Sequence, residues 1–129
     1  MEQVKKNKEF VIDYFNAISG VTKSRDLLGK YVTDQSLVEH ILFFDAVFPM
    51  YELFIDEMMG EGNKVNVRAR VKGVHGGDFN GIPPTGKQVE IQFVVMYEIE
   101  NKKIIHHWLI ADQLALMEQL GIMNEPAAV

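Results

Sequence analysis

The chain of 129 residues is long enough for one domain with a substantial core, and we expect a single domain over residues 1–129. A formal net charge of −5 argues against nucleic acid as the main partner, and the absence of cysteine excludes disulfides, a thiolate nucleophile and cysteine metal ligands. The apolar runs are too short to cross a bilayer and the first residues lack the apolar stretch of a signal peptide, so we expect a cytoplasmic protein with no membrane partner.

The first part of the sequence predicts three helices. Apolar residues recur every three or four positions in the first of them, and Gly20 is a suitable residue just past its end. Ser24 is a favourable N-cap for a short second helix, and Pro49 disfavours continuation of the third. The predicted bounds are Gln3 to Ile18, Arg25 to Tyr31, and from Asp34 or Ser36 through Val47.

After Pro49 the apolar spacing changes from helical to alternating, which predicts strands. In the second and third strands the odd-numbered residues are apolar, so we expect them to face the interior. The segment from Gly60 to Asn63 and the pair Asn101-Lys102 have the composition and length of turns. The strands are predicted over Tyr51 to about Met59, Val65 to Val71, Val89 to Ile99 and Ile104 to Ala111.

A final helix is predicted from Asp112 to Leu120, with Gly121 ending it and Met123 to Val129 as a frayed tail. Helices that come first and strands that come last, joined by connections of hairpin length, indicate an α+β fold with an antiparallel sheet. The carboxylate of Asp112 lies where an apolar strand meets the final helix, so it is either a helix N-cap or a buried acid/base.

Several motifs carry a resemblance to a known family. They are Gly73, His75, Gly77, Phe79, Gly81 and Pro83-Pro84-Thr85-Gly86-Lys87 in a Gly/Pro-rich loop, then Lys103-Ile104, Trp108, Asp112 and Gln119-Leu120-Gly121, with Phe48-Pro49 and Glu61-Gly62-Asn63-Lys64-Val65 upstream. This pattern resembles the SnoaL-like polyketide (ester) cyclases, a branch of the NTF2-like superfamily, over nearly the whole chain. The resemblance implies a cystatin-like cone, in which a strongly curved antiparallel sheet wraps around the N-terminal helices and leaves an internal cavity. Such a cavity is a natural small-molecule site.

Asp112 is the leading catalytic candidate. In the family that the chain resembles, the aspartate four residues after the tryptophan is the acid/base of an intramolecular aldol condensation that needs no metal or cofactor. An acid inside an apolar pocket has a raised pKa, which suits it to proton transfer. The alternative is that Asp112 only caps the final helix, by accepting hydrogen bonds from the backbone of residues 113–115.

The histidines supply further candidates. His75 follows the inward-facing valines of the second strand, where it could donate to a carbonyl or enolate oxygen, or could be a satisfied core histidine. The resemblance places His40 at the cavity mouth, as a ligand contact or a structural residue. His106 and His107 are adjacent on a strand and point to opposite faces, so they cannot share a metal ion, and we predict no metal site. The family usually has glutamate at the position of His106.

Aromatic side chains are the remaining candidates for substrate binding, although aromatic residues at strand spacing are often simply core. If they line an open cavity, they favour a flat, apolar ligand. These candidates are Tyr14, Phe48, Phe79, Phe93, Tyr97 and Trp108.

The leading hypothesis is a SnoaL-like, cofactor-independent cyclase or related enzyme that transfers a proton on a small polyketide-like or cyclic carbonyl compound. The alternative is a non-catalytic NTF2-like protein that binds a small ligand or acts as a dimeric accessory protein. A ketosteroid-isomerase-like isomerase is a second alternative, whereas epoxide hydrolysis is disfavoured because Arg68 and Arg70 fall on the polar strand face. Apolar residues on both strand faces, Val94 and Met96 among them, predict a homodimer formed through the outer face of the sheet.

Overall fold

The computed structural model describes residues 1–122, so the predicted tail from Met123 to Val129 lies outside the described residues. The predicted order of helices and strands is confirmed, and the bounds differ from the predicted ones by a few residues at some ends. The elements are α1 (Glu2–Ile18), α2 (Arg25–Gly29), α3 (Gln35–Val47), β1 (Glu52–Glu61), β2 (Lys64–Val74), β3 (Gln88–Glu100), β4 (Lys103–Ala111) and α4 (Gln113–Leu120).

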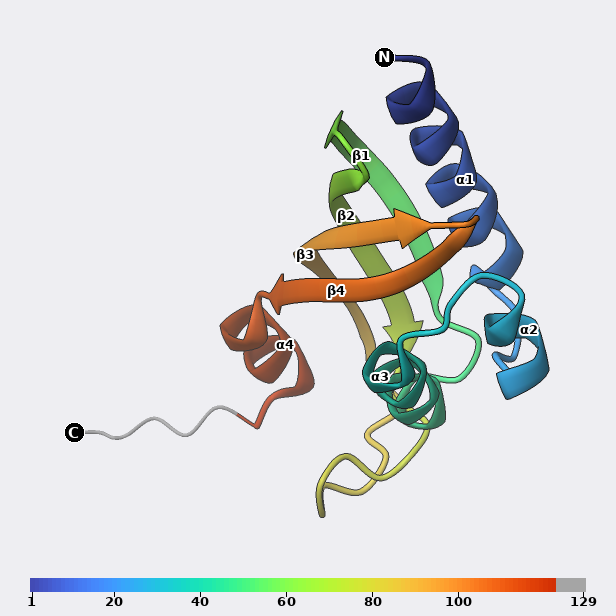
Figure 1. Cartoon of the computed structure of the whole chain (residues 1–129). Coiled ribbons are helices and arrows are strands. Elements are labelled where there is room, and N and C mark those ends of the chain that lie inside the picture. The colour runs from blue at the N-terminus through green and yellow to red at the C-terminus, as the bar shows by residue number, and fades with distance from the viewer. Residues whose placement is uncertain (123–129) are drawn as a thin grey trace.

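The four strands form one antiparallel sheet in the order β1-β2-β3-β4, and the sheet curves around the N-terminal helices (Figure 1). α1 packs against β1 and β2, while α4 contacts β3. This arrangement confirms the predicted α+β class, with a curved antiparallel sheet around the N-terminal helices. No helix within residues 1–122 is long and apolar enough to span a membrane.

The alternating pattern of β3 has the predicted consequence for the core. Its odd-numbered residues, Val89 through Ile99, are buried, and the even-numbered residues face the outer side of the sheet. β1 departs from simple alternation because its register with β2 shifts between Ile55 and Glu57, which leaves Asp56 as the extra residue of a bulge. β1 pairs with β2 as far as Glu61, so the predicted four-residue turn from Gly60 is reduced to Gly62 and Asn63.

The β3–β4 hairpin has the predicted two-residue loop. Asn101 and Lys102 both have positive φ, at 52° and 60°, which is the backbone conformation of a type I′ turn. The twist of this turn matches the right-handed twist of the strands that it joins. β4 is consequently held beside β3 along its length, with a second register shift between Glu98 and Ile99.

α4 is fixed against β3 beyond the end of β4. The backbone N–H of Asp112 donates to the carbonyl oxygen of Gln92 at 3.0 Å. Farther along, the side-chain amide of Gln119 accepts from the N–H of Glu90 at 2.7 Å and donates to the carbonyl oxygen of Glu90 at 2.9 Å. Gly121 then ends the helix with a φ of 74°, a left-handed conformation that suits glycine. This helix therefore closes one end of the concave side of the sheet.

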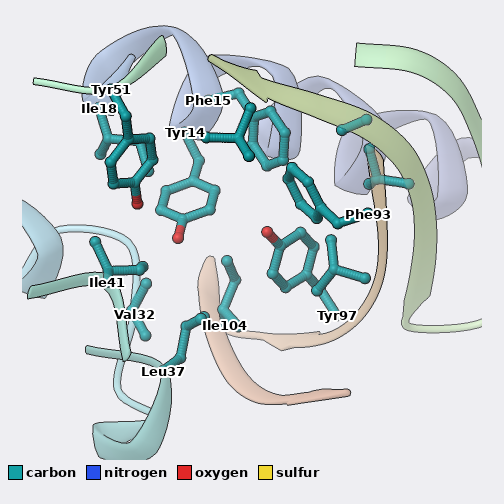
Figure 2. Close-up of a cluster of buried hydrophobic side chains, with 14 of the residues drawn as sticks. Tyr14, Phe15, Ile18, Val32, Leu37, Ile41, Tyr51, Phe93, Tyr97 and Ile104 are labelled. Atoms are coloured by element: carbon teal, nitrogen blue, oxygen red, sulfur yellow. The ribbon is translucent and has the colours of Figure 1, made fainter. Parts of the chain in front are cut away.

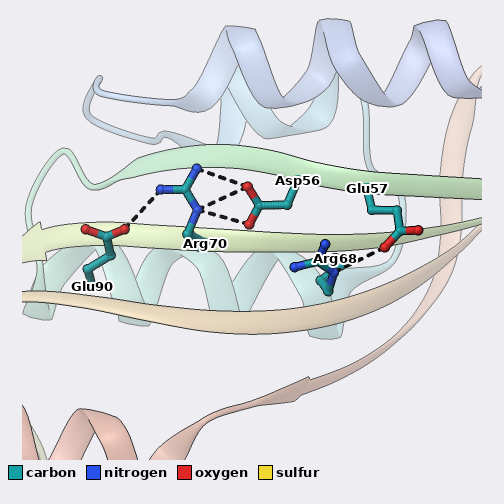
Figure 3. A network of polar contacts seen from close by, with 5 residues as sticks. All are labelled: Asp56, Glu57, Arg68, Arg70 and Glu90. Atoms are coloured by element: carbon teal, nitrogen blue, oxygen red, sulfur yellow. Dashed lines mark hydrogen bonds and ion pairs between the residues drawn. The ribbon is translucent and has the colours of Figure 1, made fainter.

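The outer face of the sheet carries charged side chains, as the alternation predicted for Arg68 and Arg70. Figure 3 shows Arg70 bridging two carboxylates on the neighbouring strands, Asp56 on β1 and Glu90 on β3, at 2.9 and 3.0 Å. The hydrogen bonds to these carboxylates raise the pKa of Arg70, and those from Arg70 lower the pKa of Asp56. Arg68 pairs with Glu57 at 3.3 Å in the same way.

Candidate functional site

A cavity of about 380 Å³ lies between the concave face of the sheet and the helices. Its size is within the range of small-molecule sites, and its wall is mostly aromatic and aliphatic. The lining residues are Tyr14, Phe15 and Ile18 of α1; Leu37, His40, Ile41, Phe43 and Phe44 of α3; Tyr51, Leu53, Val71, Ile91, Phe93, Tyr97, Leu109 and Ala111 of the sheet and its approach; Phe79 and Asn80 of the loop; and Gln113, Leu116 and Met117 of α4.

Three tyrosines come together at the inner end of this cavity. Tyr14, Tyr51 and Tyr97 are 1%, 5% and 3% exposed, and Figure 2 shows their hydroxyl groups pointing into the same space. The rings of Tyr14 and Tyr97 meet edge to face, with centroids 5.9 Å apart. Burial is the largest cause that raises the pKa of each phenol well above its ordinary value. All three hydroxyl groups therefore remain protonated hydrogen-bond donors at neutral pH.

His40 is the histidine that the structure places in the cavity wall. It is exposed yet contributes to the lining, so it lies where the cavity meets solvent. Its ring stacks on Phe44 with centroids 6.3 Å apart. Although its outer edge reaches solvent, the apolar neighbours partly desolvate the ring and lower the pKa of His40, and the nearby charge of His107 adds to this effect. His40 is thus a neutral imidazole near neutral pH, able to accept a proton.

Asp112 has the geometry of the helix cap that the sequence left open as an alternative. Its side chain is exposed, and its Oδ1 atom accepts a hydrogen bond from the backbone N–H of Ala115 at 3.0 Å. Its neighbours Ala111 and Gln113 both line the cavity, but Asp112 itself is not among the lining residues. The structure therefore places this carboxylate at the margin of the site, and its catalytic role stays a prediction.

His75 is fully buried beneath the Gly/Pro-rich loop and outside the cavity wall. Its Nδ1 atom accepts from the backbone N–H of Thr85 at 3.2 Å, which assigns the ring proton to Nε2 in the neutral form. Its own backbone N–H and carbonyl bond to Lys87 and Gly86, so this residue fastens both ends of the loop. Its ring also meets Phe79 edge to face, and Phe79 does line the cavity. In this position His75 holds the loop, and its role toward substrate is a prediction.

The predicted aromatic candidates divide into two groups. Tyr14, Phe79, Phe93 and Tyr97 line the cavity as expected. Phe48 and Trp108 do not, and for these two the expectation of a cavity position is corrected. Phe48 packs fully buried against His75, while Trp108 pairs with Met96 on the outer face and is 56% exposed.

Other lining residues carry polar atoms that the sequence analysis did not select. They are Tyr51, Asn80 and Gln113. Tyr51 has the parity of the inward-facing Leu53, which was a usable signal for it. Asn80, with a φ of 49°, and Gln113 lie in a loop and a first helical turn, where no periodicity indicates direction. Within the described part of the chain, no three His, Cys, Asp or Glu side chains are grouped so that they could hold a metal ion.

Comparison with known proteins relates the chain to one family and one fold. Residues 24–120 match the model of the SnoaL-like polyketide cyclase family. No curated protein sequence matches the chain significantly.

Solved structures share the architecture at low sequence identity. AclR, a candidate hydroxylase from Streptomyces galilaeus, superposes with a TM-score of 0.80 at 20% identity, covering 98% of this chain and 86% of that one. A candidate SnoaL-like polyketide cyclase from Jannaschia sp. CCS1 gives 0.79 at 23% identity, covering 94% and 95%. IdmH, a candidate polyketide cyclase from Streptomyces antibioticus, gives 0.74 at 20% identity, covering 89% and 98%. These neighbours carry different named activities. The structural likeness therefore supports the fold, and the reaction has to be inferred from the residues of the site.

Proposed function

Because the chain belongs to the SnoaL-like polyketide cyclase family, we propose that it is an enzyme that binds a small, flat carbonyl compound in its cavity and transfers a proton on it. The reaction type is an intramolecular aldol condensation or a related proton transfer. In that chemistry a base removes the proton next to a carbonyl group, and the resulting enolate carbon attacks a second carbonyl carbon. The second carbonyl oxygen then takes up a proton, so this sequence of steps requires no cofactor.

The observation that carries this proposal is the cavity itself. It combines a mostly aromatic and aliphatic wall with a proton-accepting imidazole, His40, and three phenolic donors. An apolar wall favours a flat hydrophobic skeleton, and a low local dielectric strengthens each polar contact to the reacting oxygen.

Two residues are candidates for the acid/base. Asp112 is supported by the family motif and by its position between two lining residues, with only Oδ1 engaged by the helix backbone. His40 is supported by its place in the lining and its lowered pKa. His75 remains the candidate that the family motif suggests for the carbonyl oxygen, and its position beneath the loop supports a role in holding Phe79 in the wall.

One observation favours a second function. The carboxylate of Asp112 is exposed and caps α4, which is also what a ligand-binding protein without catalysis would show. In that case the cavity would only bind the small molecule. Asp112→Ala would then lower stability by about 1 kcal/mol through the lost cap, and Asp112→Asn would be nearly silent.

Hydrogen–deuterium exchange on 2-tetralone, a flat bicyclic ketone with acidic protons beside its carbonyl group, tests the proposal. In D₂O, NMR should show faster loss of these protons with the protein than with buffer alone. Replacing the catalytic group, by Asp112→Asn or His40→Gln, should reduce this rate by a factor of roughly 100 to 10,000 with binding retained.

A matched pair of variants ties the activity to the cavity. Ala111→Phe places a ring in the lining and should abolish both binding and exchange, whereas Ile110→Phe, on the outer face of the same strand, should change neither. If the protein binds 2-tetralone but does not speed the exchange of its protons, the ligand-binding function is supported and the enzymatic one is contradicted.

We also propose that the protein forms a homodimer through the outer face of the sheet. Val94 and Ile110 are 38% and 58% exposed there, beside the exposed indole of Trp108. An antiparallel sheet with one solvated face normally carries polar residues at such positions.

A further inference from the structure

The strongest unassigned feature is the group of phenols at the inner end of the cavity. Tyr14 comes from α1, Tyr51 precedes β1 and Tyr97 lies on β3, so three separate segments bring their hydroxyl groups into one space (Figure 2). The edge-to-face contact of Tyr14 and Tyr97, at 5.9 Å and 88°, fixes two of the rings relative to each other.

The Tyr14 and Tyr97 hydroxyl groups interact with each other, and the remaining surroundings of the three hydroxyl groups are largely apolar. The side chains that Figure 2 shows across the same space are aliphatic, Leu37 and Ile41 among them, and both also line the cavity. Buried hydroxyl groups usually have a hydrogen-bond partner, because leaving one unpaired costs free energy. A group of donors that faces an apolar cavity is therefore suited to an acceptor that the ligand brings.

A buried lysine supports one member of the group from behind. The Lys23 ammonium lies 3.7 Å from the centroid of the Tyr51 ring and donates to the Tyr51 carbonyl oxygen at 2.7 Å. It also pairs with Asp45 at 3.5 Å. These contacts hold the Tyr51 ring in place, and the position of its hydroxyl group with it.

We propose that Tyr14, Tyr51 and Tyr97 form a donor subsite for one oxygen atom of the ligand, so that a cyclic ketone enters the cavity with its carbonyl oxygen at the inner end. This inference rests on the proposed function, because it assigns an orientation to the ligand of the same cavity. Neutral donors aimed at a carbonyl oxygen also stabilise the enolate that forms when the neighbouring proton is removed.

The test compares 2-tetralone with tetralin, which has the same bicyclic skeleton without the oxygen. Calorimetry should show tighter binding of 2-tetralone, by roughly fivefold for each hydrogen bond that it gains. The carbonyl stretch of bound 2-tetralone should also move to lower frequency. Tyr14→Phe, Tyr51→Phe and Tyr97→Phe should each reduce the preference and the frequency shift, with the affinity for tetralin unchanged.

Tyr31→Phe is the matched control, because Tyr31 packs on Tyr14 at 5.6 Å but is not part of the lining. Equal affinities for the two compounds, or a preference that survives in all three Phe variants, would overturn the subsite. If the protein binds 2-tetralone more tightly than tetralin but does not catalyse proton exchange, the subsite is supported and the catalytic function is contradicted. If neither compound binds, both proposals fall together.

Discussion

The Nδ1 atom of His107 lies 2.8 Å from the Oδ2 atom of Asp34, which joins β4 to the start of α3. The other oxygen of the same carboxylate accepts hydrogen bonds from the backbone N–H groups of Ser36 and Leu37. One carboxylate therefore caps α3 and fixes it to the sheet. Because α3 supplies one wall of the cavity, this contact holds that wall at its distance from the sheet.

Replacing Asp34 by alanine should lower the free energy of unfolding by about 1–3 kcal/mol, because the helix cap and the contact to His107 are both lost. Asp34→Asn keeps most of the cap, so its free energy of unfolding should lie between those of the unchanged protein and Asp34→Ala. Urea denaturation followed by circular dichroism measures these differences. Asp26→Ala, which removes an exposed carboxylate in the first turn of α2, is the control and should cost far less. Equal losses in the two alanine variants would contradict the structural role of Asp34.

The same carboxylate predicts a loss of stability in acid. Burial alone would raise the pKa of Asp34, but hydrogen bonds from His107, Ser36 and Leu37 outweigh burial and hold the pKa below its ordinary value of 3.8. The unfolded chain therefore takes up this proton at a higher pH than the folded chain does. The stability that Asp34 contributes is fully present above pH 3.8 and is lost as the pH falls through the lower folded value. Denaturant titrations at stepwise lower pH should show a shallower acid loss in Asp34→Asn than in the unchanged protein, and identical slopes would refute the assignment.

Gly77 should tolerate no side chain. Its backbone N–H donates to the carbonyl oxygen of Val47 at 3.0 Å, which brings the loop onto the end of α3, and a Cβ atom there would collide with the carbonyl oxygen of Ala46. Gly77→Ala should therefore destabilise the protein by about 1–3 kcal/mol, the usual cost of overpacking. Gly29→Ala is the matched control, since a Cβ atom at Gly29 meets nothing within 4 Å, and its midpoint of thermal unfolding should stay the same or rise. A thermal shift that does not distinguish the two variants would show that the loop moves freely off α3.

The proposed dimer should be visible in analytical ultracentrifugation at micromolar concentration. Ile110→Glu places a charge in the apolar part of the outer face and should yield monomers with an unchanged fold. Val21→Glu, at an exposed position outside the sheet, is the control and should leave the dimer intact. If the unchanged protein sediments as a monomer, the exposed Val94 and Trp108 side chains do not form a dimer interface.

Periodicity was sufficient to predict the strands and much of the cavity wall. The alternation of β3 predicts that Phe93 and Tyr97 face the interior, and both line the cavity. Trp108 shows what periodicity does not predict, because the direction of a side chain on β4 depends on the register of β4 with β3. Trp108 pairs with the outward-facing Met96, and the register shift before Ile99 has no signature in the local sequence.

The chemistry of the site was harder to predict than its wall. Asp112 and His75 were selected from a family motif, and the structure uses one as a helix cap and the other to fasten a loop. Tyr51 was placed in the first predicted strand but was not selected for the site, because a tyrosine that fills a core and one whose hydroxyl group faces an open space have the same local pattern. Only the placement of α1 and α3 across the sheet separates these two cases.

The pairing of Gln119 with Glu90 also has a consequence for how this protein avoids misassembly. β4 ends opposite Phe93, so the first residues of β3 would present unpaired backbone groups along an open margin of the sheet. An open margin of this kind recruits strands from other molecules and begins edge-to-edge aggregation. Gln119 occupies both backbone groups of Glu90, and the N–H of Asp112 occupies the carbonyl oxygen of Gln92. α4 thus shields a part of the β3 margin that no strand covers.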